Sequence, residues 1–236
     1  MIKAGLIPAV KAGRLPGSEN WFVVEMFPGA YPLEELEAAL LRVSVRPVEG
    51  LLDVLKQGQD GLKRAVNQIM PDDDSELLLY IDQFEEAFTF VEQENERAQL
   101  LDAILGAATA PDSRVHVVVT IRADFYDKPL LYPQFGEMFR QNTEVVLPMN
   151  RDELEAAITG PAEAIGMRID PSLVQAIVND VEDQPGGLPL LQYALTELFE
   201  RRDGPLLTLQ SYAEIGGALG ALARRADDIY VQLDEQ

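Results

Sequence analysis

The segment that decides the fold is Leu77-Leu-Leu-Tyr-Ile-Asp82-Gln-Phe-Glu85-Glu86. Its first five residues are apolar or aromatic, and acidic and amide side chains follow at once, which predicts a buried strand with a polar end. Strands of a parallel sheet that is covered on both faces carry such continuous apolar runs. The carboxyl ends of these strands are the edge at which α/β sheets bind their ligands.

Other stretches have the same apolar character, and helical patterns alternate with them. Further strands are expected at Trp21–Phe27, Val115–Ile121 and Thr143–Leu147. Apolar residues recur at helical spacing in Pro32–Val43, Gln59–Met70 and Arg97–Ala108. This alternation predicts an α/β domain that is doubly wound around a parallel sheet.

After Pro148 every further segment has a helical pattern. Asn150 is a good N-cap, and Glu153 stands three positions later to complete a capping box. The remaining helices are expected at Pro171–Asp180, at Leu188–Arg202, from Thr208 to Gly216, and at Leu219–Leu233. We therefore expect an α/β domain over residues 1–148 and an all-α helical domain over residues 149–236.

Composition excludes several classes of function. The 236 residues carry 40 acidic against 19 basic side chains, a net charge of −21, and no Lys/Arg cluster, so direct binding of nucleic acid is not expected. The absence of cysteine rules out disulfides and thiolate metal sites, and the single histidine, His116, rules out a His-pair site. No apolar run approaches the roughly 18 residues of a membrane span, so we expect no membrane partner and a cytoplasmic location.

Asp82 stands at the end of the deciding strand and is the first candidate for chemistry. A carboxylate there can hold the water shell of a Mg²⁺ ion, which keeps several waters and needs few protein ligands. The segment has the form of a Walker B motif. The alternative interpretation is that Asp82 only supplies an N-cap to the helix that follows.

A second strand, Val117-Val-Val-Thr120-Ile-Arg122-Ala-Asp124, also ends in polar groups. A guanidinium suits phosphate because its planar fork stays charged and binds in a bidentate way. A salt bridge from Arg122 to Asp124 or Asp82 is the structural alternative. Two neighbouring strands that end in complementary polar groups favour a site more than either does alone.

The third candidate is the turn Gln184-Pro-Gly-Gly187-Leu188-Pro189. Two glycines and a proline fix a tight entry into a helix. A helix N-terminus of this kind can face a nucleotide. A helix start without any further role is the alternative.

Taken together, these segments resemble the STAND class of signalling ATPases, in particular the bacterial novel STAND nucleotide triphosphatases. The resemblance covers nearly the whole chain. Its segments are Lys3-Ala-Gly-Leu-Ile-Pro-Ala, Phe27-Pro-Gly-Ala, Asp82-Gln-Phe-Glu-Glu, Thr120-Ile-Arg-Ala-Asp-Phe-Tyr-Asp127, Gln141-Asn-Thr, Gly187-Leu-Pro and Ile215-Gly-Gly-Ala-Leu-Gly followed by Ala-Arg-Arg-Ala-Asp.

The resemblance implies a partial P-loop sheet of the ASCE/STAND type and a role for each candidate residue. Asp82 would organise Mg²⁺ through water, and Arg122, supported by Thr120, would sense the γ-phosphate. Gly187, Leu188 and Pro189 would line the adenine side of the pocket. Relatives often continue into a winged-helix unit and WD repeats, and their binding of Mg-ATP couples sensing to self-assembly or to binding of protein partners in signal transduction.

Two departures from the family pattern matter. Gln83 follows Asp82 where many P-loop ATPases have a Glu that polarises the attacking water. Gln orients a water but is a poor base. Glu85 and Glu86 are the candidate substitutes from the next turn, and we expect slow hydrolysis at best.

The second departure is that no G-x-x-x-x-G-K-[ST] occurs in the chain, so it lacks the backbone cradle for phosphates. The family's first strand, expected between the strands at 115–121 and 143–147, is absent with it and would leave two unpaired edges. Truncation, a misassigned start codon and a decayed gene fragment are the three explanations. Without this loop, the chain is expected to be inactive. The expected cofactor of the complete family member is Mg-ATP, and the alternative is that this chain binds no cofactor.

Two rival functions remain. The chain could be a non-enzymatic scaffold that binds a protein partner through its helical domain and acidic surface. An unrelated α/β hydrolase fits poorly, because the sequence has no nucleophile elbow and His116 lies inside an apolar strand.

Overall fold

A computed structural model describes residues 2–182, 184, 187–202 and 204–220. The chain divides into two compact units, Met1–Glu144 and Val145–Gln236. Each unit is described by itself.

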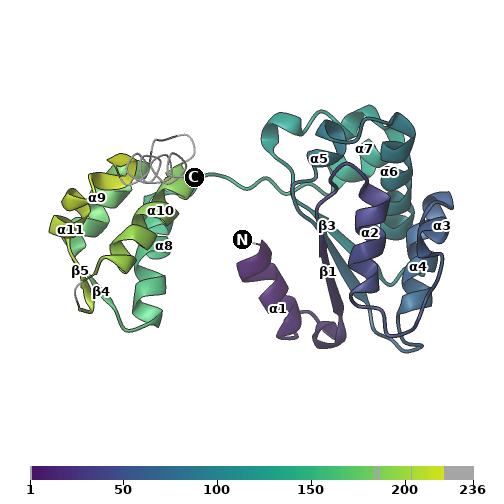
Figure 1. Cartoon of the computed structure of the whole chain (residues 1–236), viewed down its shortest axis with the longest axis horizontal. Coiled ribbons are helices and arrows are strands. Elements are labelled where there is room, and N and C mark those ends of the chain that lie inside the picture. The colour runs from purple at the N-terminus through teal and green to yellow at the C-terminus, as the bar shows by residue number, and fades with distance from the viewer. Residues whose placement is uncertain (1, 183, 185–186, 203, 221–236) are drawn as a thin grey trace, which may run out of the picture. The chain divides into compact units, whose positions relative to one another are not determined.

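The first unit is built on a parallel sheet in the order β1-β2-β3 (Figure 1). Its strands are β1 (Phe22–Met26), β2 (Leu77–Ile81) and β3 (Val115–Val119). The register places Ile81 beside Met26 on one side and Val119 on the other. All three strands therefore end at the same level, and the residues that follow them share one edge of the sheet.

Helices cover both faces of this sheet. The helices of the first unit are α1 (Ile7–Lys11), α2 (Pro32–Leu41), α3 (Leu51–Leu55), α4 (Gly61–Ile69), α5 (Glu86–Thr89), α6 (Glu94–Thr109) and α7 (Pro133–Gln141). A π-helical turn, Ile2–Leu6, precedes α1, and 3₁₀ turns occupy Ser18–Asn20, Gly58–Asp60, Ala123–Phe125 and Pro129–Leu131.

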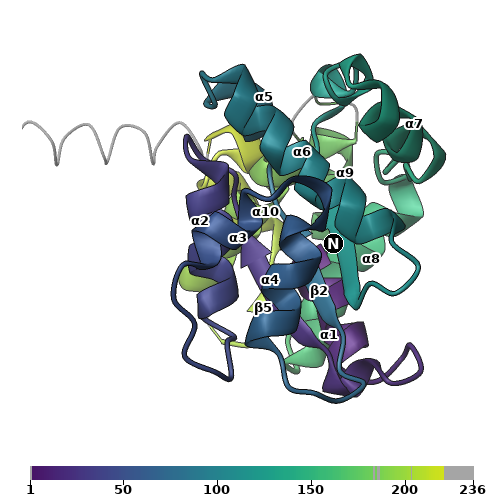
Figure 2. The same cartoon turned by 90° about the vertical axis from the view of Figure 1, so that its right-hand side faces the viewer.

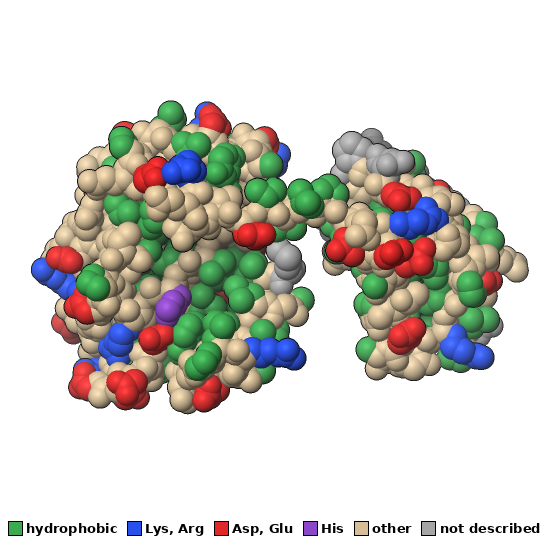
Figure 3. All heavy atoms as spheres, turned by 180° about the vertical axis from the view of Figure 1, so that it is seen from behind, with side chains coloured by type: hydrophobic (Ala, Val, Ile, Leu, Met, Phe, Trp, Pro, Cys, Tyr) green, Lys and Arg blue, Asp and Glu red, His purple; other side chains and the backbone are tan. Residues whose placement is uncertain are grey.

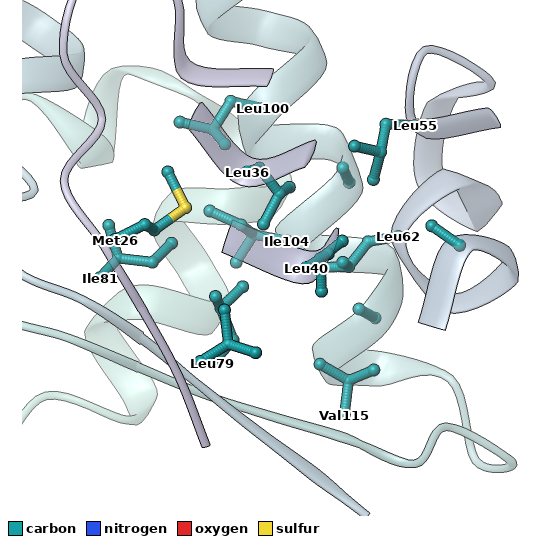
Figure 4. Packing of buried hydrophobic residues seen from close by; sticks show 14 of the residues in the cluster. Met26, Leu36, Leu40, Leu55, Leu62, Leu79, Ile81, Leu100, Ile104 and Val115 are labelled. Atoms are coloured by element: carbon teal, nitrogen blue, oxygen red, sulfur yellow. The ribbon is translucent and has the colours of Figure 1, made fainter. Parts of the chain in front are cut away.

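The main core lies on one face of the sheet. Leu79 and Ile81 of β2 pack there with side chains from α2, α4 and α6, among them Leu36, Leu62 and Ile104 (Figure 4). All five residues of β2 are buried, as its continuous apolar sequence predicts for a strand covered on both faces. Figure 2 shows α2, α3, α4 and α6 layered over the sheet.

The opposite face of the sheet carries a smaller cluster. Leu78 and Tyr80 of β2 meet Ile7 and Val10 of α1 there. Figure 1 shows α1 on the side of the sheet away from α2 and α4. Helices on both faces of a parallel sheet make the α/β class that the sequence predicts.

The first three strand predictions are confirmed, with β1 and β3 slightly shorter than expected, but the prediction of a strand at Thr143–Leu147 is wrong. Residues 143–150 form neither helix nor strand. Val145, Val146 and Leu147 are 69%, 65% and 75% exposed, and Figure 3 shows apolar side chains along this segment. A strand needs a backbone partner, and β3 is paired only with β2 in the described part of the chain.

The second unit is mainly helical. Its helices are α8 (Arg151–Ala164), α9 (Pro171–Val181), α10 (Gly187–Glu200) and α11 (Leu209–Glu214). The predicted capping box is confirmed: Glu153 N donates to Asn150 Oδ1 at 3.0 Å, and Asn150 N donates to Glu153 Oε2 at 2.8 Å. The expected helix at 219–233 lies almost entirely outside the described residues.

Two short strands in this unit were not expected from the sequence. β4 (Arg168–Ile169) pairs in parallel with β5 (Leu206–Leu207). Leu207 is buried in the core of the unit, where it joins Leu173, Ile177 and Leu198. The pairing tethers the loop that follows α10 to the loop that precedes α9, and two residues per strand are too few to leave a periodic pattern.

Candidate functional site

The carboxyl ends of β2 and β3 bring Asp82 and Thr120 together. Each follows the last residue of its strand, and the strands are in register at Ile81 and Val119. Thr120 Oγ1 donates to Asp82 Oδ1 at 2.6 Å. Thr120 N donates to the Ile81 carbonyl at 3.0 Å, so the ladder between the strands continues through the site. The two side chains predicted from separate motifs are therefore in direct contact.

Gln83 has a backbone conformation that sequence reasoning missed. Its φ of +53° lies in the left-handed region, where the described chain has no other non-glycine residue. The Gln83 N–H points back and donates to Asp82 Oδ1 at 3.1 Å and to Thr120 Oγ1 at 3.3 Å. Phe84 N then donates to the Thr120 carbonyl at 2.8 Å, and the Phe84 ring is fully buried. The strained turn thus holds Asp82 at the edge while it anchors the chain in the core.

The environment of Asp82 favours its charged form. Partial burial opposes the charge, but hydrogen bonds from the Thr120 and Tyr80 hydroxyls, the nearby Lys3 ammonium and the Gln83 N–H outweigh burial and hold the pKa of Asp82 below its usual range. The Asp82 side chain is 25% exposed. It is therefore an accessible carboxylate at neutral pH.

Arg122 is bound to Asp124 rather than to Asp82. Its Nε lies 3.0 Å from Asp124 Oδ1 and its Nη2 2.8 Å from Oδ2, a bidentate pair. Hydrogen bonding to Asp124 raises the pKa of Arg122. The side chains are 67% and 57% exposed. The salt bridge that the sequence analysis gave as the structural alternative for Arg122 is therefore present, with Asp124 as the partner. The guanidinium group nevertheless remains exposed to solvent.

Five of the predicted site residues line one hollow of about 200 Å³. They are Asp82, Gln83, Glu85, Thr120 and Arg122, and Ile121 completes the wall. Glu85 Oε2 accepts a hydrogen bond from the Arg122 N–H at 3.3 Å. A larger hollow, about 620 Å³, lies in the second unit between Ile165 and Pro205, but none of the predicted residues lines it.

Glu86 is separated from this hollow by its own contact. Its Oε2 accepts a hydrogen bond from the Gly29 N–H at 3.0 Å. Gly29 has a φ of +59°, a conformation that glycine adopts without strain. Glu86 therefore holds the turn after β1, and of these two glutamates Glu85 is the one that lines the hollow.

The turn Gly187-Leu188-Pro189 belongs to the second unit and begins α10. A Cβ on Gly187 would lie 2.6 Å from the Val181 carbonyl oxygen, so close packing of α10 against the end of α9 requires glycine. Leu188 and Pro189 are exposed. The packing accounts for Gly187, and a contact of this turn with adenine stays a prediction.

The donors near Asp82 suit a cation that keeps most of its water. In the described part of the chain, no three His, Asp or Glu side chains gather closely enough to enclose a metal ion. One carboxylate with a neighbouring hydroxyl fits Mg²⁺, which is commonly held by one or two carboxylates, water and substrate phosphates. The residues present would thus hold a hydrated Mg²⁺ through Asp82 Oδ2, because Oδ1 already accepts two hydrogen bonds.

Comparison with known proteins identifies the family of this chain. The model of the family Novel STAND NTPase 1 matches residues 1–236, and the chain belongs to that family. No curated protein matches the sequence.

Among solved structures, a mutant RuvB from Thermotoga maritima is similar with 16% identity and a TM-score of 0.37. The match covers 89% of this chain and 65% of that one.

None of the helices in the described ranges is long and apolar enough to span a membrane.

Proposed function

We propose that this chain is part of an ATP-dependent signalling switch. In its complete form the switch binds Mg-ATP, hydrolyses it slowly, and couples sensing to assembly with itself or with protein partners. In this proposal residues 1–148 contribute the nucleotide-binding core, and residues 149–236 form a helical domain that leads toward an output domain. Membership of a STAND NTPase family supports the class of activity.

One observation carries the proposal: the contact of 2.6 Å between Thr120 Oγ1 and Asp82 Oδ1. It joins the ends of two strands and leaves Oδ2 as the oxygen available to a hydrated Mg²⁺. Thr120 fixes the rotation of the carboxylate, so that Oδ2 presents a constant direction to the ion. Arg122 lines the same hollow. We propose that it exchanges Asp124 for a γ-phosphate when nucleotide binds, because an exposed ion pair is broken at little cost.

Slow hydrolysis is expected because the residue that follows Asp82 is an amide. Gln83 contributes its backbone N–H to Asp82 and Thr120, and its amide is a poor base. Of the two candidate substitutes, Glu85 lines the hollow and Glu86 does not. We propose that Glu85 orients the attacking water from a position one turn beyond that of the usual Glu.

The printed sequence contains no Walker A loop, so the proposed activity belongs to a chain that includes one. Such a loop supplies backbone N–H groups and a Lys for the phosphates. By itself the present chain offers Asp82 and Arg122 but no cradle. We therefore expect it to be inactive and to bind ATP weakly or not at all.

The test compares Asp82→Asn with Asp102→Asn in the protein produced together with the coding sequence upstream of Met1. Asp102 is exposed on α6, away from the hollow, and the two substitutions remove the same charge. Asp82→Asn should lower Mg-dependent ATP turnover by about tenfold or more, the range expected when a group that positions a reactant is lost. Turnover of Asp102→Asn should match that of the unmodified protein. Equal turnover in both variants, or an upstream region that does not encode a phosphate-binding loop, would contradict the proposal.

A second candidate function is a protein-interaction scaffold. The observation that favours it is the run Val145-Val-Leu147, three consecutive apolar residues that are each at least 65% exposed. We infer that a partner covers this run, because exposed apolar residues that lie together mark interaction sites when they form one patch. Calorimetric titration with Mg-ATP separates the two functions when it is made on the protein produced together with the coding sequence upstream of Met1. The switch should bind Mg-ATP there with micromolar affinity or tighter, and the scaffold should not bind it.

A further inference from the structure

Lys3 places a cation against the carboxylate that the proposed function assigns to Mg²⁺. Its Nζ lies 3.6 Å from Asp82 Oδ2 and 3.3 Å from Glu25 Oε2. The same ammonium stands 5.2 Å from the centre of the Phe27 ring and 5.8 Å from that of Tyr80. Two carboxylates and two aromatic rings from neighbouring strands therefore surround a single positive charge.

The backbone of Lys3 is held close to this position by its neighbours. Lys3 belongs to the turn Ile2–Leu6, and both ends of that turn pack against the apolar cluster of Ile7, Val10, Leu78 and Tyr80. The segment is thus fastened to the face of the sheet, and the Lys3 side chain extends from it to the edge. The Lys3 side chain is 50% exposed, so the ammonium can leave into solvent without unfolding this anchor.

The two oxygens of Asp82 have different partners. Oδ1 accepts hydrogen bonds from Thr120 Oγ1 and the Gln83 N–H, whereas Oδ2 faces Lys3. A hydrated Mg²⁺ that binds Asp82 must use Oδ2, the oxygen that the ammonium already faces. Like charges at this separation repel, so the metal and Lys3 compete for one oxygen.

We propose that Lys3 is an internal cation that neutralises Asp82 and Glu25 in the metal-free protein and is displaced when a divalent cation binds. The contact acts as an autoinhibitory brake, because metal binding has to break the pairs of Lys3 with both carboxylates. The inference rests on the proposed metal role of Asp82. Since the pairs are half-exposed, the brake is weak and reversible.

The test measures Mn²⁺ binding to the present chain by electron paramagnetic resonance, with no nucleotide. Lys3→Gln removes the competing charge and should tighten Mn²⁺ binding roughly two- to fivefold, the size that exposed ion pairs supply. Lys11→Gln is the matched control: it removes the same charge from α1, and Lys11 makes no ion pair with any described residue. Its Mn²⁺ affinity should equal that of the unmodified chain.

Asp82→Asn separates failure of this inference from failure of the proposed function. Weaker binding in Asp82→Asn but unchanged binding in Lys3→Gln overturns the role of Lys3 and leaves Asp82 as the metal ligand. Undiminished binding in Asp82→Asn removes the metal role of Asp82, and the inference falls with it. Should Lys3→Gln not fold, side-chain ¹⁵N NMR of the unmodified chain gives the second readout. Added Mg²⁺ should shift the Lys3 Nζ resonance and not that of Lys11, and an unmoved Lys3 signal overturns the proposal.

Discussion

The backbone conformation of Gln83 is set by the contacts of its neighbours and not by the intrinsic preference of glutamine. Its φ of +53° is uncommon for a non-glycine residue. Two hydrogen bonds from its N–H and the burial of the following Phe84 hold it there. Residues in such conformations cluster at functional sites, where the surrounding structure compensates for the strain.

The strain at Gln83 can be tested by changing the side chain alone. Gln83→Val should lower the free energy of unfolding of the first unit by about 1–2 kcal/mol, because a β-branched residue is poorly accommodated in the left-handed region. Gln83→Asn should be nearly neutral, since asparagine is enriched there. Urea unfolding followed by the fluorescence of Trp21, the single tryptophan, measures both. Equal stability of the two variants would show that the residue is not strained.

Tyr212 predicts a loss of stability at alkaline pH. The buried hydroxyl donates to Asp180 Oδ2 at 2.8 Å and accepts from the Ala218 N–H at 2.9 Å. Burial, followed by the bond to Asp180, raises the pKa of Tyr212. A raised folded-state pKa means that this stability is complete below the pKa of unfolded tyrosine, about 10, and is lost as the pH rises above it.

Tyr212→Phe should therefore destabilise the second unit by about 1–3 kcal/mol at neutral pH, since Asp180 and the Ala218 N–H lose their partner. The difference from the unmodified chain should narrow above pH ~10. Circular dichroism during urea unfolding at pH 7 to 11 measures it. Tyr31→Phe, at a tyrosine that is 63% exposed, is the control. A difference that stays constant with pH would count against the assignment.

At the scale of elements, two glycines of the second unit predict different effects of the same substitution. Gly187→Ala places a Cβ 2.6 Å from the Val181 carbonyl oxygen and should destabilise the α9–α10 pair by about 1–3 kcal/mol. Gly160→Ala, inside α8, meets no atom within 4 Å beyond its chain neighbours. Because the ring of the following Pro161 crowds a Cβ on a helical residue and offsets the gain in helix propensity, this change should be nearly neutral. Thermal unfolding followed by helical circular dichroism measures both effects.

The result at Gly187 also bears on its predicted nucleotide contact. A loss of stability in the absence of nucleotide identifies Gly187 as a packing residue. Retained stability together with weaker ATP binding, in a chain that contains the Walker A loop, would instead favour the nucleotide role. The two measurements therefore separate structure from function at one position.

At the scale of the whole molecule, the chain passes from the first unit to the second through an exposed segment. Residues 143–150 form no helix or strand, and Val145 to Leu147 are exposed. Limited proteolysis with thermolysin, which cleaves before apolar residues, should cut first between 144 and 149. Both fragments should keep their helical circular dichroism, because each unit has a core of its own. A first cut inside either unit would contradict this division.

Much of the fold follows from local pattern. The apolar run Leu77–Ile81 predicts a strand with the bounds that β2 has, because a strand buried on both faces needs no polar residue in its sequence. The capping box at Asn150 and Glu153 predicts the start of α8 for a reason that is also local. The run at 143–147 has the same apolar character but is not a strand. A strand also needs a neighbouring strand to accept its backbone hydrogen bonds, and the apolar composition of a segment does not supply one.

The candidate site divides in the same way. The sequence alone predicted the residues at the strand ends, Asp82, Thr120 and Arg122. Polar residues that follow apolar strands meet at one edge of a parallel sheet. Which partner each one takes was decided by the tertiary structure: Thr120 binds Asp82, Arg122 takes Asp124, and Glu86 turns away to Gly29. The left-handed Gln83 and the ammonium of Lys3 beside Asp82 also arise only in the folded chain. These contacts join residues from separate elements, and only the packing of those elements fixes the distances between them.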